Sequence, residues 1–365
     1  MTKRIVRREG QQSLSFTSPL LARILSSRGV LNADDLDHSL KGLLAPDSFL
    51  GIGEAATILA DALESDSSIL IVGDFDADGA TSCTLMVTAL RAMGARQVNY
   101  LVPDRFKFGY GLTPEIVDVA VQFKPAVIVT VDNGIASVEG VAHANTLGIS
   151  VVVTDHHLPG HELPAAAAIV NPNQSGCEFP SKSLAGVGVA FYLLSVLRTE
   201  LRSRDWFAHH PEINLASFLD LVALGTVADV VPMDQNNRRL VEEGIRRIRG
   251  GHCRPGLKAM LLAAGVNPQH LTTRDLAFSI APRLNAAGRL QDMSIGIECL
   301  LADEVRAVEL AEHLDALNNE RKEIETDMRD IALAHLKQLS LDEETAAGLC
   351  FYRPDWHQGV VGIVA

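Results

Sequence analysis

The chain has 365 residues, of which 47% are hydrophobic, with a formal net charge of −13 and five cysteines. This length and composition predict a large buried core in two or three domains. No apolar run of the sequence approaches the roughly 20 residues that a membrane span needs. The N-terminal segment lacks the apolar stretch of a signal peptide, and the cysteines form no CxxC pair, so we expect a cytoplasmic protein without disulfides or structural zinc. The acidic charge weighs against a broad nucleic-acid-binding surface.

From about residue 68 onward, short apolar runs alternate with amphipathic stretches. The apolar runs predict four strands, at residues 68–73, 97–102, 126–132 and 150–155. A helix is predicted at 80–94, and Thr113 followed by Pro114 is typical of another helix start. Buried Val/Ile strands separated by helices indicate an α/β fold with a mostly parallel sheet covered by helices on both faces.

Acidic motifs follow three of these predicted strands. DFDADG begins at Asp74, Asp132 precedes Asn-Gly, and Asp155 precedes a pair of histidines, His156 and His157. Parallel sheets bind ligands at the carboxyl ends of their strands. We therefore expect these carboxylates and imidazoles to meet at one edge of the sheet.

Beyond residue 185 the pattern becomes mainly helical, and residues 304–339 contain no Gly or Pro and predict one long connecting helix. After it, GLCFY at 348–352 is typical of a strand that opens a new domain. We expect five parts: an N-terminal helical segment (1–45), a catalytic domain (46–235), a helical extension (236–300), the connector helix (301–340) and the incomplete beginning of a second α/β domain (341–365).

Three kinds of site could explain the spacing of Asp74, Asp76 and Asp78. The spacing matches the first half of an EF-hand calcium loop, but the twelfth position is Leu85 instead of a bidentate Glu. A phosphatase with Asp74 as nucleophile would leave the paired histidines unexplained. A centre for two divalent cations needs about five or six carboxylate or imidazole ligands, and this requirement fits the sequence best.

Four ligands of such a centre would be Asp74, Asp76, Asp132 and His156. Asp229, an acid in an otherwise apolar run, is the candidate fifth ligand, although it could equally be a polar residue at a helix end. Oxygen-rich ligation with a single imidazole favours Mn²⁺ or Mg²⁺ over zinc. An adjacent histidine, free of metal, could contact a phosphoryl oxygen or donate a proton.

In this order, VGDFDADGATS, VTVDNGI, VTDHH and GTVADVVPM resemble the four motifs of the DHH phosphoesterase superfamily. Further stretches resemble its bacterial RecJ branch of single-strand-specific exonucleases, namely PDRFKFGYGL, VNPNQ, LAGVGVAFYL, APRLNAAGRL and WHQGVVGIVA. The resemblance covers residues 20–365 and implies a C-terminally truncated relative. It implies a Mn²⁺- or Mg²⁺-dependent 5′→3′ exonuclease that releases mononucleotides from single-stranded DNA in repair and recombination. It also implies a monomer with two partners, single-strand-binding protein and a RecQ-type helicase.

Carried over motif by motif, the resemblance implies five metal ligands, namely Asp74, Asp76, Asp132, His156 and Asp229. It implies that Asp132 bridges the two cations. His157 matches a catalytic position, and Asp78 is placed with it although its role stays open. Basic and polar residues in two other motifs are candidates for holding DNA, with structural salt bridges as the alternative: Arg105, Arg283, Asn285, Arg289 and His357.

One position departs from the small-molecule phosphatases of the superfamily, which carry a histidine ligand where this chain has Leu70. One metal site should therefore have fewer protein ligands. Two other functions stay open, a phosphodiesterase for short oligonucleotides or cyclic dinucleotides and a non-catalytic replication scaffold.

Overall fold

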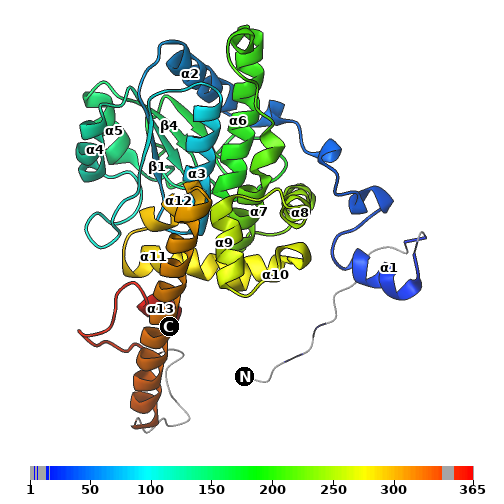
Figure 1. Cartoon of the computed structure of the whole chain (residues 1–365), viewed down its shortest axis with the longest axis vertical. Coiled ribbons are helices and arrows are strands. Elements are labelled where there is room, and N and C mark those ends of the chain that lie inside the picture. Colours follow the sequence, from blue (N-terminus) through cyan, green and yellow to red (C-terminus); the bar gives the residue numbers. More distant parts are fainter. Residues whose placement is uncertain (1–3, 5, 7–13, 16, 339–348, 365) are drawn as a thin grey trace.

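The computed structural model describes residues 4, 6, 14–15, 17–338 and 349–364. Within them, five strands form one parallel sheet in the order β2-β1-β3-β4-β5 (Figure 1). The strands are β1 (Ile69–Gly73), β2 (Val98–Leu101), β3 (Val127–Val131), β4 (Ser150–Thr154) and β5 (Ala168–Val170). The α/β prediction and the four predicted strands are confirmed, whereas the three-residue β5 was not predicted.

Alternate side chains of the buried strands pack on opposite faces of the sheet. In β1, Ile69 and Ile71 join a large core with the helices of one face, α2 (Ile52–Glu64), α3 (Ala77–Ala92), α6 (Gly186–Ser203) and α7 (Leu219–Ala228). Leu70 and Val72 join a smaller core with α4 (Pro114–Ala120) and α5 (Val138–Thr146) on the other face. Figure 1 shows these two layers on either side of the sheet. Burial on both faces explains why the strands are continuously apolar.

The rest of the chain is mainly helical, as predicted. Its helices are α1 (Pro19–Ser26), α8 (Gln235–Arg249), α9 (Pro255–Ala263), α10 (Thr273–Asp275), α11 (Ala281–Leu290), α12 (Ser294–Leu301), α13 (Glu304–Gln338) and α14 (Val361–Val364). Short 3-10 turns occur at Ala33–Leu36, Leu40–Gly42, Pro46–Ser48, Val121–Phe123, Trp206–Ala208, Leu215–Phe218 and Pro268–His270, and Leu276–Ile280 is a π-helical turn.

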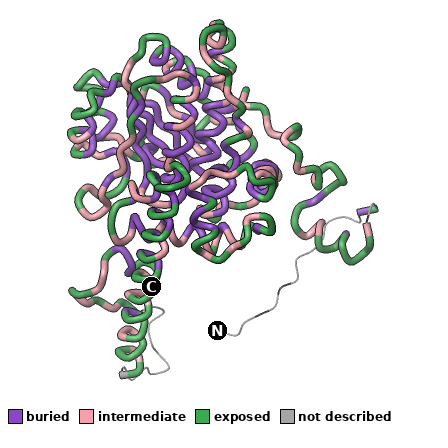
Figure 2. Tube along the Cα trace, viewed as in Figure 1, coloured by how far each residue is buried: buried purple, intermediate pink, exposed green. Residues whose placement is uncertain are grey.

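Helix α13 confirms the predicted long helix, while its role as a connector stays a prediction. Its first half packs against α9, α11 and α12, while its far end is largely exposed (Figure 2). The prediction of a strand at 348–352 is wrong for residues 349–352, which form no strand. Gly348 lies outside the described residues. A strand needs a neighbour for its backbone hydrogen bonds, and no described strand pairs with this segment. The predicted domain boundaries stay predictions.

In the described residues, we find no single helix long and apolar enough to cross a membrane; one bent pair, Leu40–Ser48 with Ile52–Glu64, meets these criteria only when both parts are taken together.

The turn from β1 into α3 places the acidic motif. Asp76 is the N-cap of α3, and its side chain accepts hydrogen bonds from the backbone N–H groups of Asp78 and Gly79 at 2.9 and 3.0 Å. Leu85, the twelfth position of the calcium-loop alternative, is fully buried within α3. The segment is therefore a strand, a turn and a capped helix, and not an EF-hand loop.

Gly79 allows α3 to start directly against the end of β1. A Cβ at this position would lie 2.4 Å from the backbone oxygen of Asp74. We expect Gly79→Ala to lower the free energy of unfolding by about 1–3 kcal/mol, because the helix must move to relieve this clash. Urea denaturation followed by circular dichroism measures the change.

Gly53 is the matched control, since it is an exposed glycine within α2 and a Cβ there would meet nothing within 4 Å. Gly53→Ala should leave the stability unchanged or raise it by up to about 1 kcal/mol, the helix propensity difference between the two residues. Equal effects of the two substitutions would contradict the tight packing of Gly79.

Candidate metal centre

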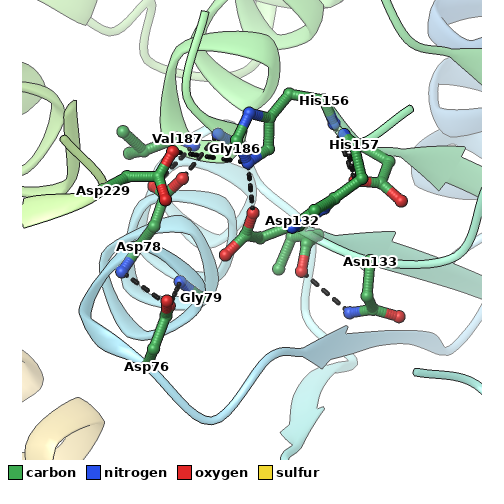
Figure 3. A network of polar contacts seen from close by, with 12 residues as sticks. Asp76, Asp78, Gly79, Asp132, Asn133, His156, His157, Gly186, Val187 and Asp229 are labelled. Atoms are coloured by element: carbon green, nitrogen blue, oxygen red, sulfur yellow. Dashed lines mark hydrogen bonds and ion pairs between the residues drawn. The ribbon is translucent and has the colours of Figure 1, made fainter. Parts of the chain in front are cut away.

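The predicted ligands meet at the carboxyl edge of the sheet. Asp74 directly follows β1, Asp132 directly follows β3, and His156 lies two residues beyond β4. Asp229 comes from the opposite direction as the C-cap of α7. Figure 3 shows His156 pointing between the carboxylates of Asp132 and Asp229, with Asp76 and Asp78 at the start of α3 nearby.

The distances define overlapping groups of potential ligands. The Nε2 atom of His156 lies 3.1 Å from Oδ1 of Asp132 and 3.5 Å from Oδ2 of Asp229. Three sets offer ligand atoms that all lie within 4.8 Å of one another: Asp74, Asp76 and Asp132; Asp78, His156 and Asp229; and Asp132, His156 and His157. Asp132 and His156 each belong to two of these sets. Of the two, only the carboxylate of Asp132 has oxygens for two cations at once, so Asp132 stands where a residue shared by two cations would be.

Several buried atoms of this cluster lack hydrogen-bond partners in the part of the chain that the structure describes. They are Oδ1 of Asp74, Oδ1 of Asp132 and Nε2 of His156. The short distance between the last two atoms does not give them hydrogen-bond geometry. Buried polar atoms in native proteins almost always have partners. The unsatisfied oxygens and the imidazole nitrogen therefore fit divalent cations of the Mn²⁺ or Mg²⁺ type.

The electrostatics of the cluster point the same way. Burial is the largest cause that raises the pKa of Asp74 to about 7, and repulsion from Asp76 is the second. The same two causes raise the pKa of Asp229 to about 7. Burial also raises the pKa of Asp132 above its usual range. Burial lowers the pKa of His156 to about 4, which keeps the imidazole in the neutral form that ligates metals. A bound cation reverses the penalty on the carboxylates, since an opposite charge favours their ionised form.

The backbone is left-handed at one predicted ligand, Asp132, and directly after another, Asp229. Asp132 has φ +62°, and Val230, which directly follows Asp229, has φ +61° and is 82% exposed. Left-handed backbone is unusual for a residue other than glycine, and especially for a β-branched one. Such strain clusters at functional sites, where the surrounding structure holds it. At Asp132 that support comes from α6. Its first residue, Gly186, packs so closely against Asp132 that a Cβ added there would lie 2.6 Å from the Asp132 Cβ.

Asp78 is buried and binds the start of α6. Its two carboxylate oxygens accept hydrogen bonds from the backbone N–H groups of Gly186 and Val187 at 2.6 and 3.0 Å. The same carboxylate belongs to one potential ligand set with His156 and Asp229. Asp78 thus holds the N-terminus of α6 against the ligand cluster.

The ring of His157 lies beside that of His156, with 4.5 Å between the centroids, and it is bound by an acid that was not among the predicted site residues. Its Nδ1 lies 2.7 Å from Oδ1 of the buried Asp155. This hydrogen bond raises the pKa of His157 to about 8. Burial opposes ionisation of Asp155, but the bonds from His157 and the backbone outweigh it and lower the pKa of that carboxyl.

Two asparagines of the VNPNQ stretch, also absent from the predicted site, hold the backbone of the histidine pair. The side chain of Asn171 donates to the carbonyl of His157 at 2.9 Å, and that of Asn173 donates to the carbonyl of His156 at 2.6 Å. In the sequence, the position of this polar stretch directly after an apolar run could have marked these asparagines as site residues. The structure shows that the apolar run is β5.

The predicted DNA-binding residues divide into two groups. Arg105 lies over the Phe75 ring at 4.4 Å, and Arg289 donates to the carbonyl of Gly359 at 3.1 Å. Burial and the neighbouring Arg105 charge lower the pKa of Arg289. The ring of His357 meets that of Phe106 edge to face at 6.0 Å. These three residues therefore come together near the start of α3.

Arg283 and Asn285 have protein partners instead. Arg283 forms an ion pair with Asp315 of α13 at 2.5 Å and donates to the carbonyl of Ser279. The side-chain oxygen of Asn285 accepts a hydrogen bond from the backbone N–H of Ala77 at 2.8 Å. The structure therefore uses both residues to join α11 to its neighbours, the alternative role that the sequence left open. Leu70 is fully buried within β1 and offers no metal ligand.

Comparisons with known proteins agree with this geometry. The family model of the DHH family, N-terminal domain, matches residues 68–226. The single-stranded-DNA-specific exonuclease RecJ of Salmonella typhimurium is 55% identical over 370 residues, which cover 100% of this chain and 64% of that protein. RecJ of Escherichia coli is 56% identical over 351 residues, covering 95% of this chain and 61% of that protein.

Two solved structures share the fold. A crystal structure of exonuclease RecJ bound to manganese matches with a TM-score of 0.77 and 35% identity, covering 88% of this chain and 78% of that one. The structure of RecJ from Thermus thermophilus in complex with Mg²⁺ matches with a TM-score of 0.71 and 31% identity, covering 95% and 45%. The chain spans 61–64% of the length of the two curated relatives.

Proposed function

The chain belongs to the RecJ family of single-stranded-DNA-specific exonucleases, and from this membership we propose that it hydrolyses single-stranded DNA from the 5′ end to 5′-mononucleotides. The observation that carries the proposal is the cluster of unsatisfied ligand atoms around Asp132, which belongs to two potential metal sites at once. A pair of cations sharing one carboxylate is the usual centre for displacement at phosphorus.

We propose that Mn²⁺ or Mg²⁺ occupies this centre, held by Asp74, Asp76, Asp132, His156 and Asp229. When bound, the cations polarise the phosphoryl group and lower the pKa of water. Asp78 acts indirectly, by fixing α6 behind the ligands. Because Leu70 takes the place of a histidine ligand, one of the two sites has fewer protein ligands than in the phosphatases of the superfamily, which speaks against a pyrophosphatase.

His157 is the proposed acid and phosphate contact of the reaction. Asp155 is anionic and accepts the proton on Nδ1, so Nε2 is the nitrogen that is free to face the substrate. With a pKa near 8, the ring carries a proton at neutral pH. It can therefore donate a hydrogen bond to a phosphoryl oxygen or a proton to the leaving oxygen.

Arg105, Arg289 and His357 are the proposed contacts to the DNA backbone. They lie together beside the acidic cluster, and a pair of neighbouring guanidinium groups favours an anion between them. For Arg283 and Asn285 the contacts to Asp315 and Ala77 support a structural role.

The wider biological role rests on family membership alone. We propose that the protein acts in DNA repair and recombination in the cytoplasm, as a monomer. Its proposed partners are single-strand-binding protein and a RecQ-type helicase.

End-labelled DNA tests the proposed function. With Mn²⁺, the full-length protein should release labelled mononucleotides at once from a single strand labelled at its 5′ end, and only late from one labelled at its 3′ end. Duplex DNA should resist digestion, and EDTA should abolish it. Early release of the 3′ label would contradict the direction, while exclusive cleavage of dinucleotides would favour the short-oligonucleotide phosphodiesterase. Absence of any activity would favour the non-catalytic scaffold.

A further inference from the structure

Tyr110 is an aromatic residue beside the metal centre to which no role has been given so far. It lies between β2 and α4, and its side chain contacts residues that follow three different strands. Its hydroxyl donates a hydrogen bond to the backbone carbonyl of Asp132 at 3.3 Å. The same oxygen lies 3.3 Å from Nδ1 and 3.5 Å from Nε2 of His157. The Tyr110 ring meets that of Phe75 edge to face at 6.0 Å.

The local backbone fixes the place of this side chain. Gly109 and Gly111, on either side of Tyr110, have φ of +75° and +78°, which side chains other than glycine rarely adopt. Immediately after them, the N–H of Leu112 donates to the hydroxyl of Ser137, in the loop that follows β3, at 3.0 Å. Two left-handed glycines thus turn the chain so that Tyr110 faces the site, and the bond to Ser137 holds the chain there.

His157 needs such support. Its side chain is 46% exposed and has one short hydrogen bond, from Nδ1 to Asp155. A ring held at one atom can still rotate about that contact, which would move Nε2 away from the substrate. Tyr110 stands beside the ring edge that carries both nitrogens, with the two ring planes at 78°. It limits this rotation.

Asp132 receives support from the same hydroxyl. Its backbone is in the left-handed region with φ +62°, and its carbonyl is the acceptor of the Tyr110 bond. One side chain therefore touches both the proposed bridging ligand and the proposed acid.

We propose that Tyr110 is a positioning residue, which holds the His157 ring with Nε2 towards the substrate and steadies the backbone of Asp132. This role deepens the proposed function and rests on it. Tyr110 acts through His157 and takes no part in the proton transfer itself.

The variant Tyr110→Phe removes the hydroxyl and keeps the ring. In the full-length protein with Mn²⁺ and single-stranded DNA, we expect kcat to fall about 10-fold and KM to change less than about 2-fold, since a misplaced reacting group costs rate more than binding. The matched control is Tyr100→Phe on β2, whose hydroxyl donates to Glu298, outside the site. It should keep the wild-type kcat.

A double-mutant cycle separates positioning from general damage. In a His157→Gln background, Tyr110→Phe should change kcat by less than about 2-fold, because residues that act through one another are not additive. A further loss of about 10-fold in that background would overturn the proposal.

A second measurement is independent of activity. In the Mg²⁺-loaded protein with ¹³C-labelled histidine, the Cε1–H signal of His157 should be a single sharp resonance, and Tyr110→Phe should split or broaden it. An unchanged resonance in that variant would also overturn the proposal. If the wild-type protein did not digest DNA, the proposed function would fail, while this signal would still decide the role of Tyr110.

Discussion

Replacing Asp132 with Asn is expected to abolish DNA hydrolysis and to remove the stabilisation of the protein by Mn²⁺. Asp132 belongs to two of the three potential ligand sets and is 2% exposed. An amide in its place offers no negative charge to either cation. Because metal ions contribute several kcal/mol to such reactions, we expect kcat to fall by at least about 10³-fold.

Asn is a better substitution than Ala at this position. The backbone of Asp132 has φ +62°, a conformation that Asn tolerates and Ala does not. Asn also keeps the side-chain volume beside Gly186, which lies in close contact with Asp132. Loss of function in Asp132→Asn therefore reports the lost charge and not a rearranged turn.

Thermal unfolding with and without Mn²⁺ gives the readout that does not depend on turnover. Cation binding should stabilise the wild-type protein by about 2.7 kcal/mol at a concentration about 100-fold above Kd. The variant should lose most of this gain while keeping the stability of the metal-free protein. Asp118→Asn is the control, since Asp118 is an exposed acid that pairs with His143 at 2.8 Å. If Asp132→Asn kept the Mn²⁺-dependent gain, Asp132 would not be a ligand.

The central strands of the sheet were predictable because they are buried on both faces. β1, β3 and most of β4 are continuous apolar runs, so their ends could be located within one residue. β5 was not predicted because its three residues, Ala168–Val170, are too few to form a recognisable pattern. The opposite error at 349–352 came from an apolar run that lacks a neighbouring strand.

The candidate metal centre was easiest to predict where a strand delivers the residue. Asp74, Asp132 and His156 follow strands, and the parallel topology brings them to one edge. Asp229 ends a helix, so its place in an apolar run made it a candidate ligand but did not distinguish it from a polar cap, and the family motif strengthened the assignment. The contacts of Asp78 with the start of α6 join residues 108 and 109 positions apart, which local patterns cannot reveal.

The same limit applies to the basic residues. Arg283 and Arg289 lie in one motif and on one helix, yet Arg283 pairs with Asp315 while Arg289 turns towards Gly359. An arginine in a motif has the chemistry to bind phosphate, but the acids that surround it in the fold decide whether its charge is available. Asp315 lies on the long helix α13, whose packing the sequence did not predict.

Replacing His157 with Ala is the second change with a large expected effect. Its ring, bound to Asp155 through Nδ1, lies beside the ligand cluster, and its Nε2 is the nitrogen proposed to face the substrate. We expect kcat to fall by about 10²- to 10⁴-fold, the usual contribution of a positioned acid or base. The Mn²⁺-dependent gain in thermal stability should stay close to that of the wild type, in contrast to Asp132→Asn, because the ligands remain in place.

The chain offers a close control for this change. His143 forms the same kind of pair, with Asp118 at 2.8 Å, on the surface at α5 and away from the cluster, so His143→Ala should leave kcat unchanged. Asp155→Asn should reproduce part of the His157→Ala loss, because an amide can no longer favour the protonated ring. If His157→Ala abolished the Mn²⁺-dependent gain and lowered kcat as strongly as Asp132→Asn, His157 would be a metal ligand. The division of labour between the two adjacent histidines would then be wrong.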